Sequence, residues 1–212
     1  MSSAAPRLYL ITDRRATNGR PLVDVVRAAL AGAPAGAVAV SLREKDLDAR
    51  ALLDLARALR AVTRDAGATL YVNDRADVAL AAEADGVHLG TRALAPDEVA
   101  RLAPKLAIAV STHGRAEVEA AARARDAGAD VRFAVFGPIW DTPSKRALGS
   151  PVGLEALRGA AGLGLPLLAL GGVTAERAAS CRAAGAVGVA AIRAICSAED
   201  PSAAVAALLA GP

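Results

Sequence analysis

Eight short apolar segments, each followed by a polar turn and usually by a segment with helical periodicity, most constrain the fold of this 212-residue chain. None of them alternates apolar and polar residues, which is typical of parallel strands that are buried on both faces. They span residues 8–13, 37–42, 69–72, 86–89, 107–110, 131–136, 167–170 and 187–191. Eight such units within roughly 200 residues predict an α/β fold, a single (β/α)₈ TIM barrel over residues 1–212 with a flexible tail at 1–6.

The predicted helices alternate with these strands. They span residues 22–31, 47–66, 77–83, 96–102, 115–127, 153–161, 175–184 and 201–209, with a brief turn or helix at 192–194. The competing fold, an open doubly wound sheet, usually carries a glycine fingerprint in its first turn. The residues there are Asp13-Arg14-Arg15, so the barrel is favoured.

Composition narrows the class of protein. Aromatic residues make up only 2% of the chain, so we expect aliphatic side chains to fill the core. A net charge of +3 without a basic tail argues against nucleic-acid partners. Cys181 and Cys196 lack metal-site spacing and are predicted to be buried free thiols. Without a signal-like or membrane-spanning apolar run, the protein is predicted to be soluble and cytoplasmic, with no membrane partner. The oligomeric state stays open.

Polar residues follow most of the predicted strands. In such a barrel the carboxyl ends of the strands meet at one mouth, where catalytic residues lie. The residues at these ends are Arg43, Lys45, Asn73, Asp74, Ser111, His113, Thr142, Ser144 and Lys145, with Gly171, Gly172 and Ala191–Arg193 completing the ring. Cations outnumber carboxylates in this set, which favours an anionic substrate such as a phosphate or diphosphate.

Two features favour phosphate in particular. Thr142, Ser144 and Lys145 bring two hydroxyls and an ammonium to one loop after the sixth strand, a set that suits an oxyanion. Gly171-Gly172 and the turn after the eighth strand resemble a phosphate cup, since glycine lets backbone N–H groups approach oxygen atoms. A solvated loop and a simple tight turn are the alternatives.

The other candidates also have structural alternatives. Arg43 and Lys45 could pair with Glu44 or Asp46 on the surface. Asp74 could cap the helix that follows it. His88 lies on an apolar strand and is better explained as a hydrogen-bonded core histidine, and His113 as an exposed loop residue.

From Tyr9 to Ile195 the chain resembles the superfamily of thiamin phosphate synthase and thiazole tautomerase. The resemblance lies in the stretches LYLITDR, SLREK, YVNDRADVALAAEADGVHLG, VSTH, FGPIWDTPSK, LALGGVTAE and AAGAVGVAAIRAI. It implies a reaction in which hydroxymethylpyrimidine diphosphate loses diphosphate and the nitrogen of thiazole phosphate attacks the resulting carbocation. Such catalysis is largely electrostatic.

The resemblance also implies roles for individual residues. Arg43, Lys45, Asn73 and Lys145 are expected to hold the diphosphate, Asp74 to ligate Mg²⁺ and Ser111 to face the pyrimidine. Thr142 and Ser144 are expected to meet the thiazole phosphate, with backbone groups at Gly171, Gly172 and Ile192.

The chain departs from the synthase pattern at a few positions. Ser41 replaces a glutamine, and Ala93 replaces the second metal carboxylate. Mg²⁺ is therefore expected to bind weakly, with diphosphate oxygens and water completing its coordination. Arg193 replaces a serine, and either points outward or grips a phosphate.

Two other functions stay open at this point. A tautomerase-like enzyme needs neither diphosphate nor metal, but is expected to use a histidine where Pro138 stands. A non-catalytic barrel that binds phosphorylated ligands is the third possibility.

Overall fold

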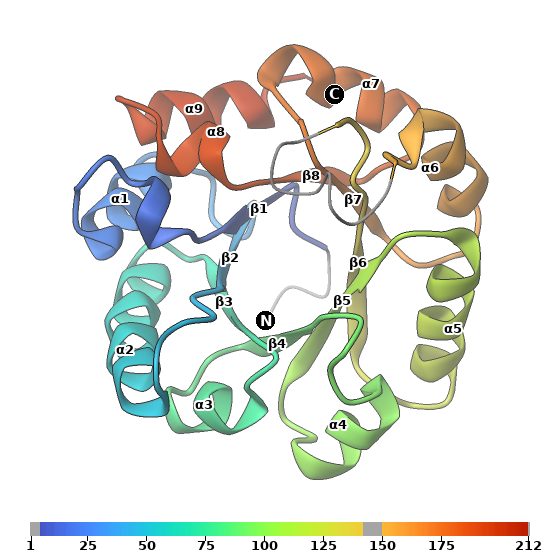
Figure 1. Cartoon of the computed structure of the whole chain (residues 1–212), viewed down its shortest axis with the longest axis horizontal. Helices are drawn as coiled ribbons and strands as arrows, with labels where there is room; N and C mark the ends of the chain where they lie inside the picture. The colour runs from blue at the N-terminus through green and yellow to red at the C-terminus, as the bar shows by residue number, and fades with distance from the viewer. Residues whose placement is uncertain (1–4, 142–149, 212) are drawn as a thin grey trace.

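A computed structural model describes residues 5–141 and 150–211. Eight parallel strands pair in sequence order, and β1 pairs with β8 to close a barrel (Figure 1). The strands are β1 (Leu8–Ile11), β2 (Val38–Leu42), β3 (Thr69–Asn73), β4 (Gly86–Leu89), β5 (Ala107–Thr112), β6 (Val131–Phe136), β7 (Leu167–Leu170) and β8 (Gly188–Ala191). The predicted (β/α)₈ barrel is confirmed.

Helices surround the barrel (Figure 1). They are η1 (Arg14–Ala16), α1 (Leu22–Leu30), α2 (Ala49–Asp65), α3 (Ala76–Ala81), α4 (Pro96–Leu102), α5 (Arg115–Asp126), α6 (Gly153–Ala161), α7 (Ala175–Ala183), α8 (Arg193–Cys196) and α9 (Pro201–Leu209). The 3₁₀ turn η1 was not predicted; the Asp13 carboxylate starts it by accepting from the Arg15 N–H. α2 begins later than predicted because Asp48 caps it through the Ala51 N–H. None of the described helices is long and apolar enough to cross a membrane.

The core has two layers of different composition. Between strands and helices it is aliphatic, as expected, and it encloses Cys181 and Cys196 as free thiols whose pKa burial raises to about 11. Inside the barrel, aromatic rings take up much of the space, which the composition did not indicate. Tyr9 makes edge contacts with Phe133 (5.1 Å between ring centroids) and Tyr71 (5.9 Å). The rings fit because small residues share this interior: Ala39, Ala109 and Ala190.

The N-terminal segment packs against this interior. Pro6 is buried and Ala5 contacts the interior cluster, so these two residues are held in place although we expected them in the flexible tail. The preceding residues 1–4 lie outside the described part of the chain.

We predict that Gly86→Ala destabilises the barrel. A Cβ at this position would overlap the Tyr71 ring and the Ala107 carbonyl oxygen, and neither can move without disturbing the interior. The free energy of unfolding should fall by about 1–3 kcal/mol, the usual cost of overpacking. Urea denaturation measures it.

Gly159→Ala is the matched control. Gly159 lies exposed in α6 with no atom within 4 Å of the added Cβ. This variant should be neutral or up to about 1 kcal/mol more stable. Equal effects of the two substitutions would contradict the role given to Gly86.

Candidate active site

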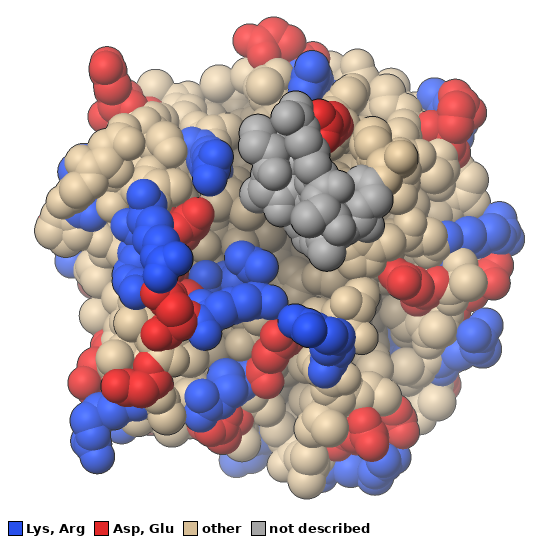
Figure 2. Space-filling model, in the orientation of Figure 1, with Lys and Arg blue, Asp and Glu red and all other residues tan. Residues whose placement is uncertain are grey.

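The carboxyl ends of the strands meet at one face, called here the mouth, and the described candidates lie around it. Figure 2 views this face, and basic side chains lie beside its central hollow. Strand polarity explains the convergence, because every strand of a parallel barrel ends on the same side.

The two carboxylates closest in sequence to Arg43 and Lys45 are bound by other arginines. Glu44 is buried; one of its oxygens accepts from the Thr12 hydroxyl (2.8 Å) and the other pairs with Arg14 (3.1 Å). Asp46 accepts two bonds from Arg14 (2.6 and 2.7 Å) and one from Arg15 (2.5 Å). The Arg14 bonds hold the pKa of Asp46 well below its usual value.

Arg43 and Lys45 are therefore left without a carboxylate. Neither forms an ion pair within the part of the chain that the structure describes, so the alternative of pairing with Glu44 or Asp46 is wrong. The Arg43 N–H donates to the Thr12 hydroxyl (2.9 Å), which fixes its backbone. Both cations lie near enough to His88 to add to the lowering of its pKa, which burial causes in the main.

Asp74 holds its carboxylate between β3 and β4. One oxygen accepts from the Gly90 N–H (2.7 Å) and the other from the Asn73 amide (2.8 Å). Its backbone is left-handed, with φ of 59°, a conformation that aspartate tolerates better than most residues and that often marks functional sites. It does not cap α3, whose N-cap is Arg75, so the capping alternative is wrong.

Few protein ligands for a metal accompany Asp74. No group of three or more histidine, cysteine, aspartate or glutamate side chains could hold an ion within residues 5–141 and 150–211. Ala93 lies in the turn next to Gly90, whose carbonyl accepts from the Ala93 N–H (3.0 Å). Position 93 is thus close to Asp74, but its methyl group supplies no ligand.

A buried hydrogen-bonded chain lies beneath the mouth. One nitrogen of His88, Nδ1, is 3.1 Å from the Tyr9 hydroxyl, and Nε2 is 2.8 Å from the Ser111 hydroxyl. His88 is only 3% exposed, and burial lowers its pKa to about 4, so the ring is neutral near pH 7. This confirms the prediction that His88 is a hydrogen-bonded core histidine. Its contact with Ser111 adds a role that we did not predict, which is to hold the Ser111 hydroxyl in place. Ser41 is also buried here; its hydroxyl approaches Tyr9 but makes no hydrogen bond of ordinary geometry.

His113 does not join this chain. It is partly exposed, and both its N–H (2.6 Å) and its ring Nδ1 (3.3 Å) contact the Glu117 carboxylate. The interpretation as a loop residue is confirmed.

The loops after β6 and β7 press against each other. The Ile139 N–H donates to the Leu170 carbonyl (2.8 Å), and the Trp140 N–H to the Gly171 carbonyl (3.1 Å). Gly171 and Gly172 have φ of 102° and 64°, and a Cβ at Gly171 would lie 2.6 Å from the Pro138 Cβ. Both positions therefore require glycine.

The remaining candidates have less structural support. Thr142, Ser144 and Lys145 lie outside the described residues. Ile192 is the N-cap of α8, and Arg193 is its exposed first residue. Their roles in binding phosphate stay predictions.

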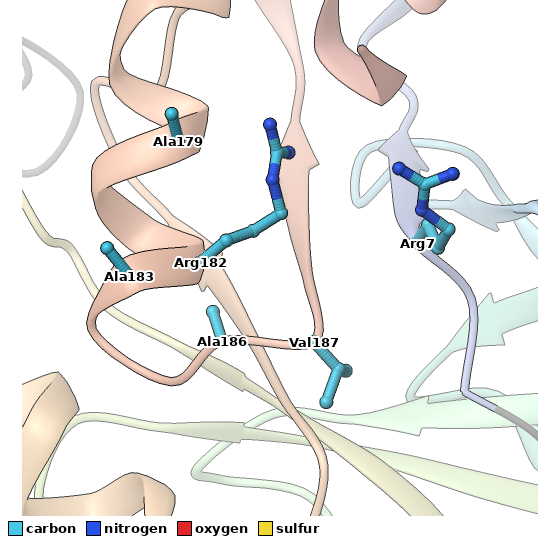
Figure 3. A pocket seen from close by; sticks show the side chains of 6 residues that line it. All are labelled: Arg7, Ala179, Arg182, Ala183, Ala186 and Val187. Atoms are coloured by element: carbon cyan, nitrogen blue, oxygen red, sulfur yellow. The ribbon is translucent and has the colours of Figure 1, made fainter. Parts of the chain in front are cut away.

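A cavity of about 530 Å³ lies at the opposite end of the barrel, beside the residues that precede β1 and β8 (Figure 3). Arg7 and Arg182 line it, but their guanidinium groups donate to backbone carbonyls, among them Leu209 (2.7 Å) and Ala210 (2.5 Å). These bonds tie down the end of α9 and occupy N–H donors of both guanidinium groups. In barrels of this kind this end serves stability rather than catalysis.

Comparisons with known proteins show which family the chain resembles over nearly its whole length. The model of a family described as thiamine monophosphate synthase matches residues 8–195. The chain is 48% identical over 203 residues to a thiamine-phosphate synthase of Roseiflexus sp., covering 95% of this chain and 83% of that one. It is 46% identical over 200 residues to a thiamine-phosphate synthase of Moorella thermoacetica, covering 93% and 91%. A solved thiamine phosphate pyrophosphorylase of Pyrococcus furiosus superposes with a TM-score of 0.81 at 35% identity, covering 95% and 93%.

We predict that His88 makes the fold sensitive to acid. Its folded-state pKa of about 4 lies below the ordinary 6.5, so the unfolded chain takes up the proton first as the pH falls. The free energy of unfolding should therefore be highest above pH 6.5, where the ring is neutral in both states. It should decrease by about 3 kcal/mol as the pH falls towards 4.

Urea denaturation at several pH values, with His88→Gln alongside, measures this contribution. The variant should be less stable at pH 7 but should lose less stability between pH 6.5 and 4. Parallel curves for the two proteins would show that His88 is not the group responsible.

Proposed function

The chain belongs to the thiamine monophosphate synthase family and its function is that of a thiamine-phosphate synthase, a transferase, and we propose that its two substrates react at the mouth. The carbon–oxygen bond to the diphosphate of hydroxymethylpyrimidine diphosphate breaks, and the thiazole nitrogen forms a bond to the same carbon. Thiamin phosphate and diphosphate are the products.

Among the residues that the structure describes, Arg43 and Lys45 have no carboxylate partner, and this observation carries the assignment of the site. Arg14 and Arg15 neutralise Glu44 and Asp46, so Arg43 and Lys45 stay available to an anionic ligand. The departing diphosphate gains negative charge as its bond breaks, and fixed cations stabilise that charge more in the transition state than before it.

The other residues complete the proposal. Asn73 holds the Asp74 carboxylate, and Ser111, held by His88, faces the pyrimidine. Lys145 joins Arg43 and Lys45 at the diphosphate. The thiazole phosphate meets Thr142, Ser144 and Arg193 and the backbone at Gly171, Gly172 and Ile192.

Mg²⁺ fits this site through one protein ligand. The Asp74 oxygens each accept one hydrogen bond, and an ionised carboxylate has further lone pairs for an ion. Oxygens of the diphosphate and water would supply the rest of an octahedron. When bound, the ion neutralises charge on the leaving group, while Asn73 and Gly90 keep Asp74 oriented.

The alternatives lack comparable support. No histidine follows Gly137 at the end of β6, because Pro138 occupies that position. The relatives named above are synthases, and nothing specific favours a barrel without catalysis. A cytoplasmic location stays a prediction.

We expect Arg43→Ala to lower kcat by about two to three orders of magnitude, the usual cost of removing a group that stabilises transition-state charge. Thiamin phosphate formation from both substrates measures it. Arg57→Ala, which removes an exposed arginine from α2, is the control and should keep full activity. Equal rates in both variants would refute the role of Arg43, and a wild-type protein that forms no product would refute the function itself.

We also expect Mg²⁺ to bind only together with diphosphate. Calorimetry should detect no tight Mg²⁺ binding to the ligand-free protein, because one carboxylate is a weak site for this ion. Ala93→Asp should strengthen Mg²⁺ binding without lowering activity, whereas Ala93→Asn adds similar volume without charge and should change it little. Tight binding to the ligand-free wild type would contradict the proposed site.

A further inference from the structure

Arg177 connects the two loops that border the Gly171-Gly172 turn. Its Nη1 atom donates to the Gly172 carbonyl (2.8 Å), and its Cζ atom lies 4.9 Å from the centroid of the Trp140 ring. One side chain of α7 thereby contacts both the segment after β6 and the segment after β7.

The position of Arg177 is unfavourable without these contacts. It lies in the first turn of α7, where the helix dipole repels a cation, and its side chain is otherwise exposed. A planar guanidinium can donate to a carbonyl and lie over an aromatic ring at the same time. These two contacts offset the dipole and hold the side chain in one conformation.

The loops leave no space between them at this point. The Trp140 N–H donates to the Gly171 carbonyl, and a Cβ at Gly172 would lie 2.9 Å from the Trp140 Cβ and 3.3 Å from Arg177 Nη1. Gly172, Trp140 and Arg177 therefore form one packed unit, and displacement of one member displaces the others.

The bond from Arg177 also sets the direction of a backbone donor. In a trans peptide the C=O and N–H groups point in opposite directions. Because the Gly172 carbonyl points to Arg177, the Val173 N–H of the same peptide points away from it. Within residues 5–141 and 150–211, neither the Gly172 nor the Val173 N–H has an acceptor.

We propose that Arg177 is a positioning residue for phosphate binding, which fixes the Gly172–Val173 peptide and the Trp140 ring so that the free N–H groups meet the phosphate of the thiazole substrate. This inference rests on the proposed binding of that phosphate at Gly171-Gly172. Arg177 acts through the backbone, and its own charge does not contact the phosphate.

Calorimetric titration with thiazole phosphate and with the dephosphorylated thiazole alcohol tests this role in Arg177→Ala and Arg177→Lys. Affinity for thiazole phosphate should fall about tenfold in both variants, the effect of one well-aligned hydrogen bond. Lysine should not replace Arg177, because a compact ammonium cannot donate to the Gly172 carbonyl and lie over the Trp140 ring at the same time as a planar guanidinium does. Affinity for the alcohol and the KM for the pyrimidine diphosphate should not change.

Trp140, the only tryptophan in the chain, gives an independent readout. Its fluorescence in the ligand-free protein should become easier to quench with acrylamide in both variants. Arg158→Ala, which removes an exposed arginine from α6, is the control and should leave affinity and fluorescence unchanged.

Three results would overturn the proposal: thiazole phosphate affinity kept in Arg177→Ala, affinity kept in Arg177→Lys, or equal losses for phosphate and alcohol. Retention by lysine would show that charge alone acts on the phosphate, since lysine binds phosphate as a point charge. These three results come from binding measurements, which do not require turnover. Absence of synthase activity in the wild type would therefore be recognised separately.

Discussion

The backbone hydrogen bonds between β1 and β8 close the sheet, and the rest of the molecule depends on that closure. Leu8 lies opposite Val189, and Leu10 opposite Ala191, so the first and last strands pair as any neighbours do. A closed sheet has no free edge, and its strands all end at one rim. Residues far apart in the sequence, such as Arg43, Asp74 and Ser111, thereby come to surround one axis.

Closure also divides the barrel into an apolar floor and a charged mouth. Tyr9, Tyr71 and Phe133 fill the interior, and His88 joins them to Ser111 at the boundary. Charges that face a poorly solvated interior interact more strongly than they do in water. Rigid rings beneath the mouth also hold the groups above them in fixed positions, which electrostatic catalysis requires.

The distribution of charge around the mouth depends on which basic residues pair with the nearby carboxylates. After β1 and β2, Arg14 pairs with both Glu44 and Asp46 and Arg15 pairs with Asp46, so the arginines of η1 bind the two carboxylates that flank Lys45. Surface ion pairs contribute little stability each, but this network removes the anions that would otherwise neutralise Arg43 and Lys45. The main effect of the network is therefore the positive electrostatic potential that Arg43 and Lys45 keep at the mouth.

The sequence by itself determined the fold and the rim of the site. Uninterrupted apolar strands alternating with helices admit few topologies, and strand polarity then places residues such as Arg43, Asn73 and Asp74 together.

Other features depended on side-chain distances that no spacing reveals. Arg14 rather than Arg43 binds Glu44. Asp74 bonds to Gly90 instead of capping α3, and His88 holds Ser111. The same holds for Arg177, whose contacts with Gly172 and Trp140 join residues from separate loops. Periodicity reports which face of an element is buried, whereas a pairing among several nearby charges is decided only when the packed backbone fixes their distances.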